Sequence, residues 1–429
     1  MTAALGAVRR VAGSTFGSLR VRNYRLYFIG QVVSVSGSWM QRIAQSWLVL
    51  HLTGSGVALG VVAALQFLPM LVLGAWGGVL ADRMDKRRLL MLTQAIMGFL
   101  ALVLGAVTLA GAVQLWMVYV LALALGLVTA MDNPARQSFV MEMVGRGQVT
   151  NAVSLNSAVF TGARVVGPAI AGLVISLVGT GWCFVINAVS FGAVVFALVA
   201  MDPAQLQRPA AGVARRRGMV MEGLRFVWSR PDIRLPLAIL AVVGTLALNW
   251  TVLLPLLARN TFHGDAGTYG LLFAVLGLGS LAGALFTASR REPSGALLLG
   301  ALAVFGVLMA AAAVAPTLPL ELVVLAPTGM AALVFQTSAN SLIQLRSDPS
   351  LRGRVMSLYA VLFIGTTPIG APIVGWVAQQ AGPRAGLLLG AATILVTAAV
   401  AAWLARSRHV FAPRPRERER SPAQPGSAL

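Results

Sequence analysis

The chain has 429 residues, of which 58% are hydrophobic and only 11% are charged. A soluble domain carries about 25% charged residues, so this composition excludes a protein that is surrounded by water on all sides. The net charge of +20 does not indicate nucleic-acid binding, because the basic residues flank apolar segments instead of coating one domain. We therefore expect a polytopic helical membrane protein.

Long apolar segments recur along the whole chain. A membrane-spanning helix needs about 20 mostly apolar residues, and short glycine-rich connections mark the turns between neighbouring helices. With these boundaries we predict an all-α membrane protein with twelve spans, at 26–50, 57–80, 89–110, 114–133, 151–178, 182–201, 235–258, 268–288, 294–314, 320–341, 355–379 and 385–404.

The basic residues are distributed unevenly between the two sides of these spans. All lysines and arginines except Arg42, Arg164, Arg259 and Arg384 fall in the termini or in every second connection. Loops rich in Lys and Arg stay on the cytoplasmic side of a membrane. We therefore expect a multi-pass protein of the bacterial cytoplasmic membrane with both termini in the cytoplasm.

The two halves of the sequence resemble each other. Arg146–Val149 recurs as Arg352–Val355, and Pro168 recurs as Pro372 at nearly the same separation. Two parallel six-span repeats place a substrate site at their interface. We predict a cytoplasmic N-terminal segment, a six-helix bundle, a linker with an interfacial helix, a second six-helix bundle and a disordered basic tail, at 1–25, 26–201, 202–234, 235–404 and 405–429.

Two spans carry a polar stripe at helical spacing. The stripes consist of Gln31, Ser34, Ser38, Gln41, Arg42 and Gln45 in the first span, and of Asn151, Ser154, Ser157, Thr161 and Arg164 in the fifth. Such a face points toward other helices or a wet cavity, because unsatisfied polar groups are costly in lipid. Two readings stay open for the arginines. They either hold helices in register through amides and carbonyls, or offer positive charge to a substrate.

Four further polar residues are candidates for a substrate or proton path. A carboxylate in a transport path can relay protons, so Asp132 is one candidate, but it can also pair with Arg136 one turn away or end the fourth span before Pro134. Three uncharged candidates lie in the second half, where hydrogen bonds between helices are the alternative reading. They are Asn249, Gln336 and Asn340.

The charged segment 77–88 separates two long apolar runs. Its pattern of Gly78, Asp82, Arg83, Arg87 and Arg88 resembles the loop between helices two and three of the major facilitator superfamily. The resemblance implies a conformational-switch loop, in which the Asp at this position helps to latch the two halves on the cytoplasmic side. One departure is Asp85, where the family usually has glycine.

The fifth span contains the segment Ala163–Gly172. Its Gly167, Pro168 and Gly172 resemble the signature of the antiporter branch of the superfamily. Proline removes a backbone donor and kinks the helix, while small residues allow close helix contact. A kink that serves packing alone is the alternative; together with the charged loop, the segment favours antiport.

Longer stretches resemble a multidrug and siderophore-exporter branch that holds enterobactin-exporter-like and macrolide-efflux-like permeases. They are Gly37–Arg42, Leu52–Ser55, Asp132–Gln137 and Ala163–Gly172. The resemblance implies export of a small lipophilic or polar metabolite or drug by proton antiport with alternating access. Uptake or facilitated diffusion is the alternative within transport, and a transport-inactive membrane sensor or scaffold is the alternative from another class.

The sequence contains no motif for a zinc site, a nucleotide site or a hydrolase. Without a phosphate-binding loop, ATP is not the energy source through this chain. We therefore expect a transporter and not an enzyme, with no cofactor and no metal. The expected partners are a small-molecule substrate, the proton as coupling ion and the lipid bilayer, with no nucleic acid, and we expect a monomer.

Overall fold

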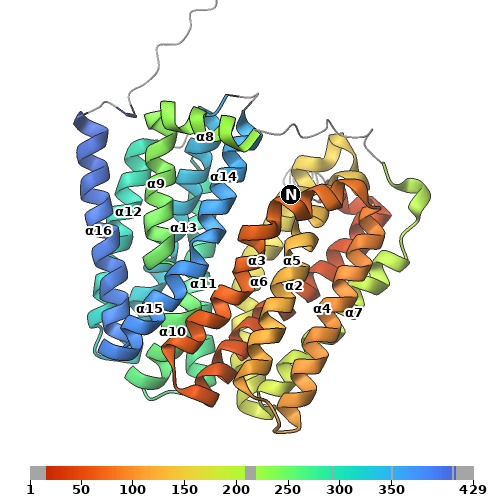
Figure 1. The fold of residues 1–429 in the computed structure, drawn as a ribbon, viewed down its shortest axis with the longest axis horizontal. Coiled ribbons are helices and arrows are strands. Elements are labelled where there is room, and N and C mark those ends of the chain that lie inside the picture. Colours follow the sequence, from red (N-terminus) through yellow and green to blue (C-terminus); the bar gives the residue numbers. More distant parts are fainter. Residues whose placement is uncertain (1–15, 208–218, 291–293, 349–350, 408–409, 412–429) are drawn as a thin grey trace, which may run out of the picture.

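The computed structural model describes residues 16–207, 219–290, 294–348, 351–407 and 410–411, and these residues form helices joined by short turns. The predicted basic tail lies almost wholly outside the described residues. The long helices gather into two bundles, side by side in Figure 1. The first bundle contains α2 (Arg22–Thr53), α3 (Gly56–Arg83), α4 (Lys86–Leu109), α5 (Leu115–Val144), α6 (Val149–Val178) and α7 (Thr180–Val199).

The second bundle follows the segment that contains the short helix α8 (Met219–Ser229), which lies across one end of the molecule (Figure 1). We call this the α8 end, and the opposite end the distal end. The second bundle contains α9 (Pro231–Leu246), α10 (Trp250–Leu256), α11 (Ala266–Ala288), α12 (Gly295–Val314), α13 (Leu318–Arg346), α14 (Arg352–Gly365), α15 (Thr367–Ala381) and α16 (Pro383–Ser407).

Within the described residues, eleven helical segments are long and apolar enough to cross a membrane. Helix α2 is not among them, although it has 32 residues and packs inside the first bundle. Its glutamines, serines and arginines lower its hydropathy. Two predicted spans are broken helices: 235–258 divides at Ala247–Asn249, and 355–379 divides at Thr366.

The predicted end of the fourth span at residue 133 is wrong, because α5 continues to Val144. Proline at position 134 removes one backbone donor, but the helix runs through it. The turns after Pro134 bury Ala135, Phe139 and Met143 in the core of the first bundle. This burial outweighs the lost hydrogen bond.

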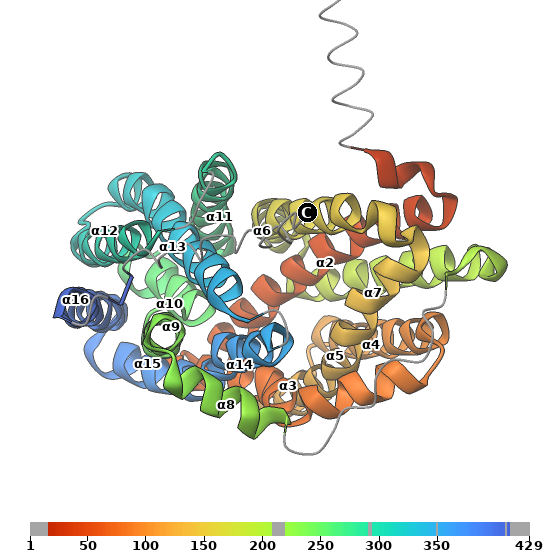
Figure 2. The same ribbon diagram turned by 90° about the horizontal axis from the view of Figure 1, so that it is seen from above.

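The bundles meet through small residues and a few polar contacts toward the distal end. Gly56 on α3 lies against Gly375 on α15, so closely that a side chain at either position would meet the other backbone. Beside them Ser55 donates a hydrogen bond of 2.7 Å to Gln379. Helices α6 and α11 also neighbour one another across the interface (Figure 2). The distal end is therefore closed by direct helix contact.

Candidate functional site

The indole ring of Trp39 contacts two arginines at the interface of the two bundles. The guanidinium carbon of Arg42 lies 4.4 Å from the centroid of the Trp39 ring, and that of Arg164 lies 5.5 Å from it. A cation above an aromatic face is attracted by the ring quadrupole. One ring thus holds a basic residue from α2 and another from α6.

Local sequence explains this arrangement. Trp39 and Arg42 are three residues apart on one helix, a spacing that places two side chains on the same face. Gly167 on α6 makes room for the indole, because a Cβ at that position would lie 2.5 Å from the Cβ of Trp39. Gly167, which the sequence analysis places in the antiporter-type kink, therefore allows Trp39 to pack against α6.

Aromatic contacts connect the site to the second bundle. The Trp39 and Phe273 rings have centroids 5.8 Å apart, and the Trp47 and Tyr269 rings stack at 6.2 Å. Both partners lie on α11. Helix α11 approaches α6 just as closely, since a Cβ at Gly277 would lie 2.8 Å from the Arg164 carbonyl oxygen. The site therefore belongs to both bundles.

The charge of the site is not neutralised within the described residues. Neither Arg42 nor Arg164 has a carboxylate within ion-pair distance among these residues, and the Arg164 Nε is buried without a hydrogen-bond partner. The two guanidinium charges also act on one another. An arginine inside a membrane costs at least about 2.5 kcal/mol. Such a pair attracts an anionic or electron-rich group.

A small cavity of about 20 Å³ lies beside Arg42 and includes Gln45, Gln66 from α3 and Thr251 from α10. A cavity of this size holds about one water molecule. It is too small for a metabolite or drug, which needs a pocket of roughly 300 Å³ or more. In this arrangement the space beside Arg42 is therefore closed to such a substrate.

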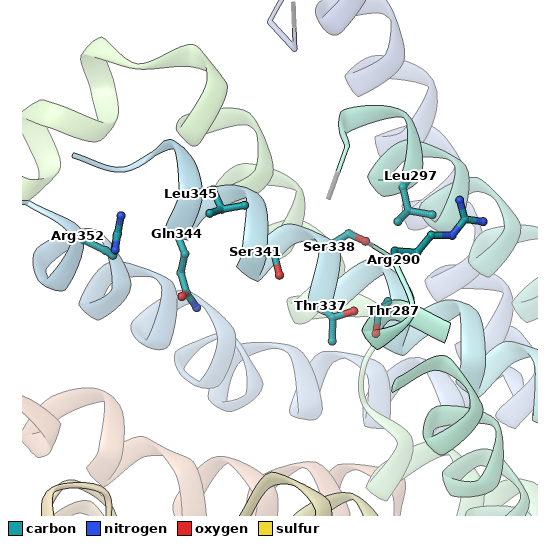
Figure 3. Close-up of a pocket in the computed structure, with 9 residues that line it drawn as sticks. All are labelled: Thr287, Arg290, Leu297, Thr337, Ser338, Ser341, Gln344, Leu345 and Arg352. Carbon is teal, nitrogen blue, oxygen red and sulfur yellow. The ribbon is translucent and has the colours of Figure 1, made fainter. Parts of the chain in front are cut away.

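A larger cavity of about 350 Å³ lies in the second bundle near the α8 end (Figure 3). Helix α13 contributes Thr337, Ser338, Ser341 and Gln344, while Arg290 and Arg352 stand at opposite sides. Asn340 accepts a hydrogen bond from Gln344 and is half-buried, as is Gln336. Asn249 is buried at the break between α9 and α10, where it donates to the Thr245 carbonyl at 2.7 Å.

The structure separates the polar stripe of α2 into two groups. Gln31 accepts a hydrogen bond of 2.5 Å from Arg136, and Gln41 accepts one of 2.6 Å from Asn187. Both glutamines are buried inside the first bundle, and their partners lie on α5 and α7 respectively. Arg42 and Gln45 alone among the predicted path residues of α2 reach the small cavity.

Asp132 pairs with Arg136, as one of the two alternatives from the sequence predicts. Its carboxylate accepts hydrogen bonds from Arg136 at 2.5 and 3.0 Å, from Thr93 at 2.8 Å and from Gln94 at 2.9 Å. The carboxylate is 1% exposed. A buried charge needs such compensation, and the cluster connects α4 to α5.

The charged loop binds the first bundle through its basic residues. Arg87 donates to the carbonyl oxygens of Leu198 and Val199, and Lys86 forms an ion pair of 2.5 Å with Glu142. Arg83 and Arg88 are exposed. The Asp82 side chain and the surroundings of Gly78 lie outside the part of the chain that the structure describes. Pro168 and Gly172, by contrast, face α11, where they contact Gly270.

The sequence prediction missed the aromatic part of the site. Trp39 lies within the segment Gly37–Arg42, three positions before Arg42. That spacing could have predicted a contact between the two side chains. Phe273 and Tyr269 gave no comparable signal, because only the tertiary contact of α11 with α2 brings them there. Among the described residues, no group of three His, Cys, Asp or Glu side chains is placed to hold a metal ion.

Comparison with known proteins agrees with this architecture. The profile of the family described as transmembrane secretion effector matches residues 13–423. The multidrug efflux pump Tap of Mycolicibacterium fortuitum is 30% identical over 403 residues, which cover 90% of this chain and 96% of that protein. The enterobactin exporter EntS of Citrobacter koseri is 25% identical over 373 residues, covering 84% and 86%.

Solved transporter structures share the fold. A bacterial homologue of the human lysosomal transporter Spinster, in an inward-facing and occupied conformation, gives a TM-score of 0.73 at 13% identity, covering 92% of this chain and 99% of that one. A bacterial homologue of the iron transporter ferroportin, in an inward-facing state, gives 0.68 at 16% identity, covering 89% and 98%.

Proposed function

Because the chain belongs to the transmembrane secretion effector family of the major facilitator superfamily, we propose that it exports a small, partly lipophilic metabolite or drug by proton antiport. The observation that carries this proposal is the Trp39 ring with Arg42 and Arg164 between the two bundles. The relatives whose names include multidrug efflux and enterobactin export support the direction of transport.

The orientation follows from the distribution of basic residues. Arg83, Lys86, Arg87 and Arg88 lie at the α8 end, together with Arg290 and Arg352. By the positive-inside rule this end faces the cytoplasm. Contacts between the bundles then close the outer side, and α2 supplies a twelfth crossing. Rocking of the two bundles about the site gives alternating access.

The chemistry of the site indicates what the substrate offers. An aromatic ring can stack on Trp39 or Phe273, and an anionic or polar group can bind the two guanidiniums. The site is complete within one chain, which supports a monomer as the working unit. A substrate that enters from the α8 end would reach the arginines before it reached the closed distal contacts.

Transport by everted membrane vesicles tests the proposal. In these vesicles the cytoplasmic face is outside, so export accumulates an anionic aromatic dye such as sulforhodamine B in the lumen when the lumen is acidic. We expect accumulation that an uncoupler abolishes, and a strong loss in Arg42→Gln. Arg25→Gln is the matched control, because Arg25 lies on the same helix and is exposed. Dye movement in the opposite direction, or full activity with an unchanged substrate range in Arg42→Gln, would contradict it.

A further inference from the structure

Glu321 is a buried carboxylic acid that lies outside the Trp39 site. Glu321 is 0% exposed and lies in the first turn of α13, at the distal end. Both of its carboxylate oxygens are buried without a hydrogen-bond partner. Glu321 shares a helix face with the buried Leu325 and Thr328, so its side chain points into the core of the second bundle and not into lipid.

The other buried carboxylates differ from Glu321. Asp132 is paired with Arg136, Glu142 with Lys86, and Asp232 with Arg230. Each of these carboxylates has a cation within 4 Å. Among the described buried acidic side chains, Glu321 is the one without such a partner. A charged carboxylate in an apolar interior is far costlier than the neutral acid unless it is paired and hydrogen-bonded.

One basic group is close enough to act on Glu321. Arg384, at the start of α16, exerts its charge on the carboxyl group without forming an ion pair. It donates a hydrogen bond of 2.7 Å to the Ala315 carbonyl oxygen, and its Nε has no partner. Glu321 and Arg384 are therefore opposite charges that are not ion-paired in this arrangement, and a conformation that brings them within 4 Å would pair them.

The other described charged residues near α13 are bound to other groups, are exposed or lie at the α8 end. Helices α11 and α12 contain no charged residue within Ala266–Ala288 and Gly295–Val314. Asp265 before α11 is held by Thr268, and Arg259 donates to the Leu50 carbonyl oxygen. His263 at the distal end is exposed. The charged residues of α9 and α14 lie at their α8-end termini. Arg384 is thus the sole described charge positioned to bind ionised Glu321.

From this geometry we propose that Glu321 binds the coupling proton from the outer side and that its protonation favours closure of the distal end. In the closed arrangement the group is a neutral acid, with the proton on one carboxylate oxygen. Loss of that proton to water leaves a carboxylate that pairs with Arg384, and no other bond changes. A proton that prefers one of two conformations shifts the population toward it.

This inference rests on the proposed proton antiport for its role in transport, but the pH switch can be measured without any substrate. In a Cys183→Ala background, spin labels at Leu177 and Gln380 report the separation of the bundles at the distal end, since both positions are exposed. For the protein in lipid nanodiscs we expect a closed distal end at low pH and an open one at high pH.

Glu321→Gln, which mimics the neutral acid, should stay closed at every pH. Glu222→Gln is the matched control, because Glu222 is exposed and pairs with Arg354 at the α8 end; it should switch as the unmodified protein does. Arg384→Met removes the partner of the charged form and should shift the midpoint upward by about one pH unit or more. An unaltered pH response in Glu321→Gln would overturn the inference.

Everted vesicles separate failure of the inference from failure of the proposed function. If the unmodified protein accumulates no sulforhodamine B, proton-driven export fails, while the label distances still decide whether Glu321 is a proton switch. If it does accumulate this dye, Glu321→Gln should lose most of the pH-driven accumulation but retain dye exchange without a gradient. Equal loss of both activities would assign Glu321 a purely structural role and overturn the inference.

Discussion

The Nε of Arg87 lies 2.7 Å from the carbonyl oxygen of Leu198, and its Nη2 lies 3.0 Å from that of Val199. These carbonyls are at the C-terminus of α7, where the last turn of a helix has no intrahelical donors. The positive guanidinium also complements the negative end of the helix dipole. Arg87 therefore caps α7 from the charged loop.

We expect Arg87→Ala to lower the free energy of unfolding by about 1.5–3 kcal/mol, the range for hydrogen bonds that involve a charged group. The adjacent Arg88 is exposed, so Arg88→Ala should change stability by less than about 0.5 kcal/mol. Unfolding of the purified protein in detergent, followed by tryptophan fluorescence, gives both values. Equal losses of stability in the two variants would show that the capping contact of Arg87 does not stabilise the protein.

Trp39 contacts two like charges, so its replacement should destabilise the site. Trp39→Leu removes two cation–π contacts, each worth about 0.5–2 kcal/mol. Trp39→Phe keeps an aromatic face and should lose less stability and less sulforhodamine B transport. Melting temperature and vesicle transport, measured together, check this order. A leucine variant that performs as well as the phenylalanine variant would exclude a role for the ring face.

The order of the helices and most of their bounds could be predicted from hydropathy and turn residues, because those signals are local. The pairing of Asp132 with Arg136 was also predictable, since four residues separate them on one helix. The contact of Gln31 with Arg136 was not, because it joins α2 to α5. Likewise Pro134 indicated a helix end, and only the buried residues beyond it explain why α5 continues.

The role of the small residues in α6 and α11 depends on long-range packing in the same way. A Cβ at Gly270 would lie 2.7 Å from the Pro168 carbonyl oxygen, and backbone cannot yield as a flexible side chain does. Gly270→Ala should therefore push α11 away from α6 and favour an open distal end. Spin-label distances at Leu177 and Gln380 measure this. Gly162→Ala is the control, because nothing lies within 4 Å of its added Cβ.

Asp265 at the N-terminus of α11 gives a prediction for pH. Hydrogen bonds from Thr268 hold the pKa of this carboxyl below its usual range. A lowered folded-state pKa contributes stability above the ordinary value of 3.8, and that contribution is lost as the pH falls through the folded-state pKa. Asp265→Ala should cost about 1 kcal/mol at pH 7. The difference should vanish at low pH in unfolding experiments; a difference that persists there would contradict the sign.

Asp132 offers the sharpest separation of a structural from a proton-relay role. Asp132→Asn keeps the shape but leaves Arg136, whose side chain is 13% exposed, without its counter-charge. Removing one partner of a buried pair costs about 3–5 kcal/mol, so the variant should unfold at a clearly lower temperature. The double variant Asp132→Asn with Arg136→Gln removes both charges and should recover much of that loss.

Transport should follow stability in this series if the pair is structural, so the double variant should regain proton-driven sulforhodamine B accumulation in everted vesicles. A relay carboxylate behaves differently, because no replacement that lacks a titrating group can restore coupling. Recovery of stability without recovery of pH-driven transport would therefore assign the proton path to Asp132. Recovery of both leaves Asp132 as the anchor between α4 and α5, which is what its four hydrogen bonds indicate.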